Sequence, residues 1–440
     1  MMKISIRKAM TYIVATAMAA CVAACSDDDN GSMSVEEQHK AIEQVTATYL
    51  NDVVYPTYSA LAAETETLYG KIAALKTKLK SGGTVAQGEI DEICKSYKTA
   101  RKYWEESEAF LYGAASDFEI DPHIDTWPLD VATLAVDLNN NSKIAALDAE
   151  DGINYARRQL TKENLGFHGI EFIFFRNGKP RSKEVFNNDA VEDYSYKGVN
   201  YFSGMTVTGR EEVIFATAVA GDLRDKCFQL EVAWMGDKAP ASHRSRVAAC
   251  ALQFDDFGTT VKKNGMSYGD DMLAAGTATS TQASWKKVLE TILVSGCSNI
   301  CAEVADQKMG QAYRAANNMA TPDGQEEPDD PNYIESPYSY NSFTDFRDNI
   351  VSIKNCLYGN RDGSTWSSHS VMAYLAALDA SRASQLDSRL KAAMKALDDC
   401  LNSGTPFVQA PGASYVKTAM EAVSSLDDYI NNTSNWLLVN

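Results

Sequence analysis

Apolar residues recur at steps of three and four along most of this chain, which is the spacing of one face of an α-helix. One such series follows Pro56 and consists of Leu61, Leu68, Ile72, Leu75 and Leu79. The glycines of Ser81-Gly82-Gly83 end it. The long alternation of apolar and polar residues that marks a half-buried strand is absent. We therefore expect an all-α protein.

A chain of 440 residues is too long for one simple core, so two domains are expected. We expect an N-terminal helical bundle over 35–205 and a C-terminal helical bundle over 206–440. Further helices are predicted at about 84–112, 127–140, 147–162, 166–176, 207–235, 281–317, 342–358, 368–402 and 413–434. Residues 177–205 form a polar excursion rich in Asn and Tyr, 236–280 show little pattern, and 318–341 are expected to be a loop.

The two predicted bundles contain one weak internal repeat. Residues 96–113 align without gaps with 342–359, and the two segments share a Ser, an Arg and a terminal Leu-Tyr-Gly. We interpret this match as a duplication that leaves a cleft between the two bundles. A chance match between two helices that end in glycine is the alternative.

The N-terminus has the pattern of a lipoprotein signal peptide, which we assign to residues 1–24. Three basic residues precede an apolar run that is too short to span a membrane as a helix. The run ends in Val22-Ala23-Ala24-Cys25, so Cys25 is the predicted lipidation site, and residues 25–34 form an acidic tether. We expect an outer-membrane lipoprotein at the cell surface, with a periplasm-facing lipoprotein, acylation at Cys21 or a plain secretory signal as alternatives. No other segment is expected to span a membrane.

The chain is strongly acidic, with a formal net charge of −18. Loss of residues 1–24 removes three positive charges and no negative charge, which makes the body more acidic still. Such a surface repels phosphates and argues against a nucleic-acid partner. The seven cysteines beyond Cys25 are scattered without the paired spacing of a zinc site, so we expect apolar filler residues.

One apolar segment, 165–175, contains both a histidine and a glutamate. His168 precedes Glu171 by three residues, so the two side chains would share a helix face. Burial of either group is costly without a partner. A core histidine satisfied by its neighbour is one interpretation, and a binding site is the other.

Four patches together resemble the imelysin family, also called the insulin-cleaving membrane protease family, which is associated with bacterial iron uptake. The third patch is the Gly166-x-His168-x-x-Glu171 signature. The others are 100–113, with Arg101, Trp104 and Glu108; 124–128, with Asp125 and Trp127; and 335–359, with Ser336, Ser339 and Asp345. The resemblance spans the chain from about Val35 to the C-terminus.

The resemblance implies an iron-related envelope protein whose four patches meet in one cleft. We expect His168, Glu171, Glu108 and Asp125 to supply metal ligands, for iron or another transition metal such as zinc. The expected binding residues around them are Arg101, Trp104, Trp127, Ser336, Ser339 and Asp345. The ligand would be iron, an iron chelate or a haem-like molecule, and an envelope transporter would be a partner.

Each of these residues also has a structural interpretation. Arg101 and Glu108 could form salt bridges within or between helices. Asp125 could cap a helix that starts at Pro128, and Ser342 could cap the helix that contains Asp345. His123 lies close to Asp125 in sequence, although a solvated loop position is the more ordinary one.

The family's peptidase name transfers poorly to this chain. The sequence contains no His-Glu-x-x-His, the usual zinc-protease arrangement, and no Gly-x-Ser-x-Gly elbow. We therefore expect a binding protein rather than an enzyme. A metallopeptidase that uses the His168–Glu171 pair and a surface interaction protein with a structural pair are the alternatives.

Overall fold

The computed structural model describes residues 33–322, 328–361 and 363–440. The predicted signal peptide, Cys25 and most of the predicted tether lie outside these residues. Within them the protein is 68% helical with almost no strand. The prediction of an all-α fold is therefore confirmed.

Six long helices make up most of the fold: α2 (Tyr55–Lys80), α3 (Gln87–Glu105), α11 (Gly209–Met235), α17 (Ser342–Tyr358), α19 (Ala380–Asn402) and α20 (Ser414–Val439). The shorter α-helices are α1 (Val35–Thr48), α4 (Ala114–Asp117), α5 (Ile120–Ile124), α6 (Val131–Leu138), α7 (Asn141–Leu147), α8 (Gly152–Gln159), α9 (Gly166–Phe174), α10 (Lys183–Asn187), α12 (Ala241–Ala251), α13 (Tyr268–Leu273), α14 (Trp285–Glu290), α15 (Asn299–Ala302), α16 (Gly310–Ala316) and α18 (Val371–Leu378). Three segments are π-helical, Tyr49–Val54, Thr291–Ser298 and Glu303–Lys308, and four are 3₁₀ turns, Glu108–Phe110, Lys162–Asn164, Gly236–Lys238 and Phe407–Gln409.

Two small antiparallel hairpins interrupt the helices. The first pairs β1 (Phe175–Arg176) with β2 (Lys179–Pro180), and the second pairs β3 (Ser195–Tyr196) with β4 (Val199–Asn200). The second hairpin lies in the Asn- and Tyr-rich excursion expected over 177–205, whereas β1 of the first occupies the end of the helix predicted over 166–176. Two residues per strand are too few to form an independent sheet.

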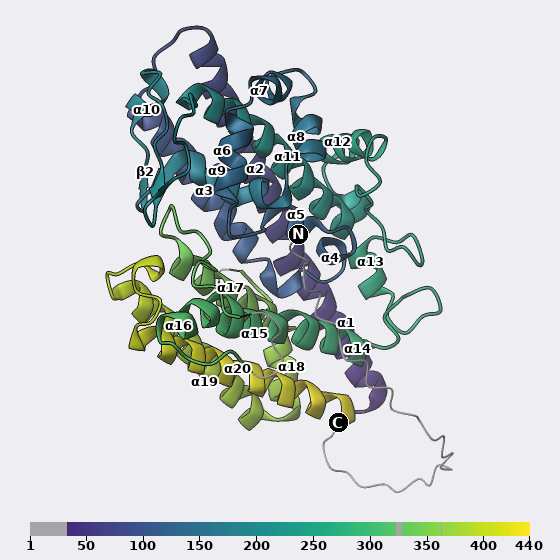
Figure 1. Ribbon diagram of the computed structural model, residues 1–440. Coiled ribbons are helices and arrows are strands. Elements are labelled where there is room, and N and C mark those ends of the chain that lie inside the picture. The colour runs from purple at the N-terminus through teal and green to yellow at the C-terminus, as the bar shows by residue number, and fades with distance from the viewer. Residues whose placement is uncertain (1–32, 323–327, 362) are drawn as a thin grey trace, which may run out of the picture.

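The helices gather in two parts of the molecule (Figure 1). Helices from α2 to α13 occupy the upper part of the view, α14 to α20 occupy the lower part, and α1 runs beside α14. In the upper part α11 packs along α2 and also contacts α8 and α9, and in the lower part α19 packs against α20. Helix α17 contacts α3, so it links the two parts.

The expected domain boundary at 205/206 stays a prediction, as does the duplication. Helix α11 begins just after that boundary but packs on α2, α8 and α9, which precede it. One hydrophobic cluster extends from Ile42 to Leu437 and includes side chains from both parts. The seven cysteines among the described residues are free and buried, as expected for apolar fillers.

Two local expectations differ from the structure. Helix α3 ends at Glu105 and a 3₁₀ turn follows, although apolar residues continue to Tyr112. The segment 236–280 contains α12 and α13, whose apolar residues are too sparse to form a clear helical pattern. The continuous helix Trp285–Ala316 is apolar and long enough to cross a membrane by length and composition alone, yet 67% of its most apolar window is buried inside the fold.

Candidate functional site

Two glycines set the position of α9, the helix that contains His168 and Glu171. Gly166 has a φ of +65°, and a Cβ atom there would lie 1.9 Å from the carbonyl oxygen of Ile124. A Cβ atom on Gly169 would lie 2.4 Å from the carbonyl oxygen of Asn164. The start of α9 therefore packs directly against the backbone that leads into Asp125.

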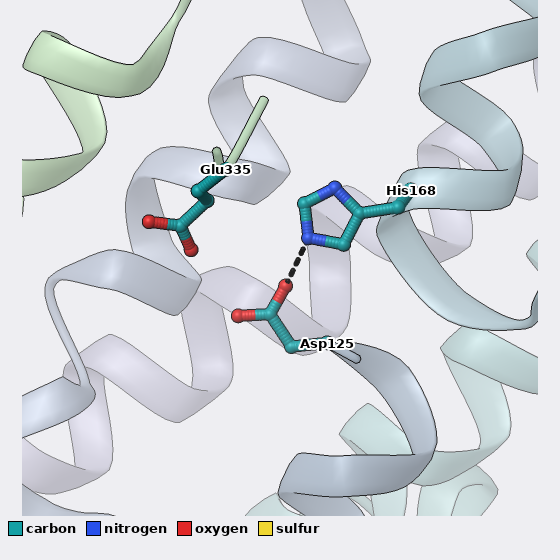
Figure 2. Close-up of side chains that lie close together, drawn as sticks. All are labelled: Asp125, His168 and Glu335. Carbon is teal, nitrogen blue, oxygen red and sulfur yellow. Dashed lines mark hydrogen bonds and ion pairs between the residues drawn. The ribbon is translucent and has the colours of Figure 1, made fainter. Parts of the chain in front are cut away.

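His168 lies between two carboxylates, Asp125 and Glu171, of which Figure 2 shows Asp125. Its Nε2 atom is 3.0 Å from Asp125 Oδ1, and its Nδ1 atom is 3.5 Å from Glu171 Oε2. All three side chains are buried. Burial disfavours the charged imidazolium, but the hydrogen bonds with Asp125 and Glu171 outweigh it and raise the pKa of His168 to about 9. Burial also opposes ionisation of Asp125, yet Arg101 and His168 hold its pKa below the usual range.

The second oxygen of Glu171 holds a loop from the other part of the molecule. Glu171 Oε1 accepts hydrogen bonds from the backbone N–H of Tyr338 at 3.1 Å and of Ser339 at 2.7 Å. The Ser339 hydroxyl donates to the same oxygen at 2.7 Å. Glu171 thus orients His168 on one side and fixes the loop 328–341 on the other.

Arg101 lies at the centre of the site and joins several carboxylates. The guanidinium contacts Asp125 and Glu335, pairs with Glu105 at 2.5 Å, and lies 3.6 Å from Asp345. Burial opposes its charge, but these carboxylates outweigh burial and raise the pKa of Arg101 further. Trp104, one turn along α3, donates its indole N–H to Asp125 Oδ2 at 2.7 Å.

Lys308 is a second buried cation that the sequence analysis missed. Its ammonium lies 3.2 Å from Glu335, and 3.5 Å from both Glu105 and Glu108. It also lies 5.2 Å from the ring centroid of Trp127. Burial raises the pKa of Glu108 well above its usual range, although Lys308 opposes this effect. Glu108 is therefore buried beside Lys308, near Glu105 and Asp125, and its role as a metal ligand stays a prediction.

The loop residues expected at the site are also buried there. The Ser336 hydroxyl donates to Asp345 Oδ2 at 2.5 Å, and the Asn341 amide donates to Asp345 Oδ1 at 2.5 Å. Ser342 is not the N-cap of α17, because α17 begins at Ser342 itself and Asn341 precedes it. The Ser342 hydroxyl instead donates to the carbonyl oxygen of Glu335 at 2.5 Å.

Two further structural interpretations were wrong. Asp125 does not cap a helix at Pro128, because it follows the C-terminus of α5 and its carboxylate binds Arg101, Trp104 and His168. His123 is buried rather than solvated. Its Nε2 atom is 2.6 Å from Asp222, in a separate cluster with Arg157.

The site residues that the sequence analysis left out had weak local signals. Glu105 is four residues after Arg101 on the same helix face, and Lys308 is a cation in a strongly apolar helix. Glu335 begins the fourth patch, but nothing in its neighbours indicates that it reaches Arg101. Only the fold brings it there.

The donor atoms converge in three overlapping groups. In each group one atom per residue lies within 4.8 Å of the others, and the groups are Asp125–His168–Glu335, Glu105–Glu335–Asp345 and Glu105–Glu108–Asp125. Figure 2 shows the first of them, with Asp125 hydrogen-bonded to the imidazole and Glu335 close to both. Arg101 lies among the carboxylates of the second group, and Lys308 contacts two members of the third. The first group contains the nitrogen ligand.

Acidic side chains outnumber basic ones in this buried site. Six carboxyl groups face three basic side chains, and all nine are buried: Glu105, Glu108, Asp125, Glu171, Glu335 and Asp345 against Arg101, His168 and Lys308. Burial raises the pKa of Glu335 to about 8 and that of Asp345 to about 7, against the effect of nearby cations. Glu335 Oε2 is buried without a hydrogen-bond partner. The site therefore retains protons that a bound cation could replace.

The chain is similar to several known proteins over most of its length. The chain is 23% identical over 386 residues to iron-regulated protein A of Synechococcus elongatus, a match that covers 88% of this chain and 83% of that protein. A crystal structure from Parabacteroides distasonis, of a protein named as an iron-regulated protein A precursor, superposes with a TM-score of 0.69 at 21% identity and covers 93% of this chain and 97% of that one. An imelysin-like protein from Psychrobacter arcticum gives a TM-score of 0.50 at 12% identity, with 90% and 93% covered.

Similarity at these identities shows a shared fold. The family assignment comes from a model of the peptidase M75 family, imelysin, which matches residues 54–431. This match spans all four patches and most of the chain. The protein therefore belongs to the imelysin family.

Proposed function

We propose that this protein is an envelope-associated iron-acquisition protein that binds a transition metal ion, iron in the first place, in the buried site around His168. The single observation that carries the proposal is the convergence of His168, Asp125 and Glu335 beside an unpaired Glu335 oxygen. The names of the relatives, iron-regulated protein A and its precursor, support an iron-related role.

The donor set fits iron better than a hard cation. One imidazole nitrogen and two carboxylates are ligands suited to iron, zinc or manganese, whereas calcium and magnesium prefer oxygen alone. Glu171 would serve as the carboxylate that orients the imidazole through Nδ1, so that Nε2 is directed at the metal. Glu171 would thus orient His168 without binding the metal, and Glu335 would be a metal ligand.

Metal binding at this site must displace protons. His168 has a pKa of about 9 and Glu335 a pKa of about 8, so both are largely protonated at neutral pH. A metal needs the neutral imidazole and the ionised carboxyl. Affinity should therefore increase between pH 6 and pH 9, and Arg101 would have to yield part of its contact with Asp125 and Glu335.

A metallopeptidase is the second candidate because the family name refers to peptidase M75. The geometry gives it less support. A peptidase must admit a peptide bond and a water molecule to the metal, and His168, Asp125, Glu171 and Glu335 are at most 3% exposed. A third possibility, a surface interaction protein with a structural His–Glu pair, does not account for the excess of buried acids.

We further propose that the protein is lipid-anchored through Cys25 and passes its bound metal to an envelope transporter. An acylated cysteine, together with a second lipid chain, would hold the protein at the membrane surface. Lipidated Cys25 would be about ten residues from the start of α1 at Val35, so the folded body would lie close to that surface.

The test is a metal analysis of the protein purified from its own host under iron-replete conditions, with and without His168→Ala. We expect iron bound to the wild-type protein in a stoichiometric amount and lost in His168→Ala. A peptide library incubated with the same protein, with and without chelator, tests the peptidase. Protein without bound metal would contradict the proposal, and chelator-sensitive cleavage would favour the peptidase.

A further inference from the structure

A separate pocket of about 510 Å³ lies beside the buried site. Its walls come mainly from the segment 128–132, the region of the β3–β4 hairpin and the loop 330–340, and Arg176, Asn177 and Val408 complete them. The first two walls belong to the part of the chain before residue 205, and the third belongs to the part after it. None of the residues that the sequence analysis assigned to binding or metal ligation lines this pocket.

Tyrosine dominates the walls of the pocket. Its five tyrosines are Tyr194, Tyr196, Tyr201, Tyr338 and Tyr340. The rings of Tyr194 and Tyr201 are stacked with centroids 6.2 Å apart, and Tyr338 meets Tyr194 edge to face at 5.9 Å. Such walls offer flat apolar faces with hydroxyl groups at their edges, which suit a flat aromatic ligand.

The pocket also carries a positive charge that no carboxylate neutralises among the described residues. Lys197 donates to the neutral amide oxygen of Asn332 at 2.6 Å and lies 5.2 Å from the centroid of the Tyr196 ring. The wall also contains Arg176, which lies 3.3 Å from Glu192, and two carboxylates held by backbone N–H groups, Asp130 at the start of α6 and Asp330 beside Asn332. Lys197 is therefore the cation in the wall that can pair with the anionic group of a ligand.

The loop 330–340 joins the pocket to the buried site. Tyr338 lines the pocket with its side chain, while its backbone N–H binds Glu171. Ile334, also in the wall, precedes Glu335 directly. Ser336 and Tyr340 in this loop have positive φ values of 49° and 57°, a conformation that non-glycine residues adopt at a cost. A ligand in the pocket would therefore contact the same loop that positions Glu335.

We propose that this pocket binds a small aromatic anion, a ring bearing a carboxylate or an ionised catechol, as the organic part of a metal chelate. The ring lies among the tyrosines, and the anionic group pairs with Lys197. The role of the anion as a metal chelator rests on the proposed function. Binding of the metal-free anion to the pocket does not depend on that function.

The experiment titrates 2,3-dihydroxybenzoate into metal-free protein at pH 7.5, with cyclohexanecarboxylate as an anion of similar size without an aromatic ring. We expect saturable binding of 2,3-dihydroxybenzoate, at least about tenfold tighter than that of cyclohexanecarboxylate. Lys197→Gln should weaken binding about fivefold to tenfold, because it removes the charge and keeps the chain length. Tyr196→Leu should weaken binding as well, because it removes one ring.

Lys395→Gln is the matched control, since Lys395 is an exposed lysine on α19 paired with Asp399, and it should bind like the wild type. Circular dichroism of each variant checks folding; both test positions lie on the exposed β3–β4 hairpin. Equal affinity for the two anions, or an unchanged affinity in Lys197→Gln, would overturn the inference. Iron binding is measured in parallel, and Lys197→Gln should retain iron binding. His168→Ala should lose iron binding and keep 2,3-dihydroxybenzoate binding, which would show that the metal site and the pocket are separate.

Discussion

At the scale of single residues, His168 is held by two carboxylates with different tasks. Asp125 is bound by three donors and has a lowered pKa, so it is the charged partner of the imidazolium. Glu171 accepts from the loop 328–341 with one oxygen and faces Nδ1 with the other. The sequence predicted the His168–Glu171 pair from its spacing of three. It could not predict that Asp125, 43 positions away, is the nearer partner of His168.

Glu171→Gln should lower the pKa of His168. An amide directed at Nδ1 favours the neutral imidazole because it no longer supplies a negative charge, and its oxygen can still accept from Ser339. We expect the pKa to move from about 9 toward its ordinary value, as measured by an NMR titration of the imidazole. An unchanged titration midpoint would show that Asp125 alone sets the pKa.

Stability of the metal-free protein should fall as the pH rises from 6 to 9. His168, Glu335 and Asp345 have folded-state pKa values of about 9, 8 and 7, each above the ordinary value of its group. The folded protein binds more protons than the unfolded chain in this window, so stability present at low pH is lost as each group deprotonates. Each group contributes at most about 1.4 kcal/mol per pH unit, and only up to its own folded-state pKa, so the contribution of Asp345 ends near pH 7 and that of Glu335 near pH 8.

Thermal unfolding of metal-free protein across this pH range measures the slope. Glu335→Gln mimics the protonated carboxyl, so it should make the slope shallower. Added iron should reverse the loss at high pH, because the metal takes the place of the protons. A flat profile for the wild-type protein would mean that these groups titrate at ordinary values.

At the scale of elements, the position of α9 depends on its glycines, because their contacts with backbone atoms leave no room for a side chain. The apolar pattern predicted a helix over 166–176, whereas the observed α9 ends at Phe174 and β1 begins at Phe175. The pattern gave no reason for the glycine at position 166. That reason is tertiary, since Gly166 contacts the backbone of Ile124.

Gly166→Ala should therefore destabilise the protein by at least about 2 kcal/mol, through a clash with backbone and an unfavourable positive φ. Gly70→Ala is the matched control, because Gly70 is an exposed position in α2 with no atom near its added Cβ, and it should stabilise by about 0.5–1 kcal/mol. Chemical denaturation measures both changes. Equal effects of the two substitutions would mean that α9 can shift away from Ile124 at little cost.

The contacts of the loop 328–341 could not be predicted from the sequence. Its Pro and Asp residues predicted a loop, and the structure has one. Glu335, Ser336 and Ser339 nevertheless contact Arg101, Asp345 and Glu171, which come from three different helices. Such long-range polar contacts leave no periodic trace in the sequence.

At the scale of the whole molecule, the buried site connects the two parts of the fold. Arg101 and His168 come from the upper part in Figure 1, and Lys308 and Asp345 come from the lower part. Apolar spacing predicted nearly all of the long helices but not which of them would meet. The four patches indicated a common site because of the family resemblance, and the excess of acids over bases emerged only with the structure.

Membrane attachment is a property of the whole chain and is tested separately. Cys25→Ala should leave the protein unlipidated and release it from the membrane fraction, because the acyl chains provide the attachment. Fractionation and mass spectrometry of the N-terminal peptide follow the outcome. A variant that remains acylated and membrane-bound would assign the anchor to another residue, with Cys21 as the first to check.

The central claim, a metal site at His168, Asp125 and Glu335, is tested most directly by an anaerobic titration of Fe(II) into metal-free protein at pH 7.5. The control for Glu335→Gln is Glu212→Gln. Glu212 is also a buried glutamate with a raised pKa, about 7, and it pairs with Arg181 outside the site. We predict one bound Fe(II) per wild-type chain, retained in Glu212→Gln and weakened at least about tenfold in Glu335→Gln. Equal Fe(II) affinity in all three proteins, or no binding by the wild-type protein, would contradict the account.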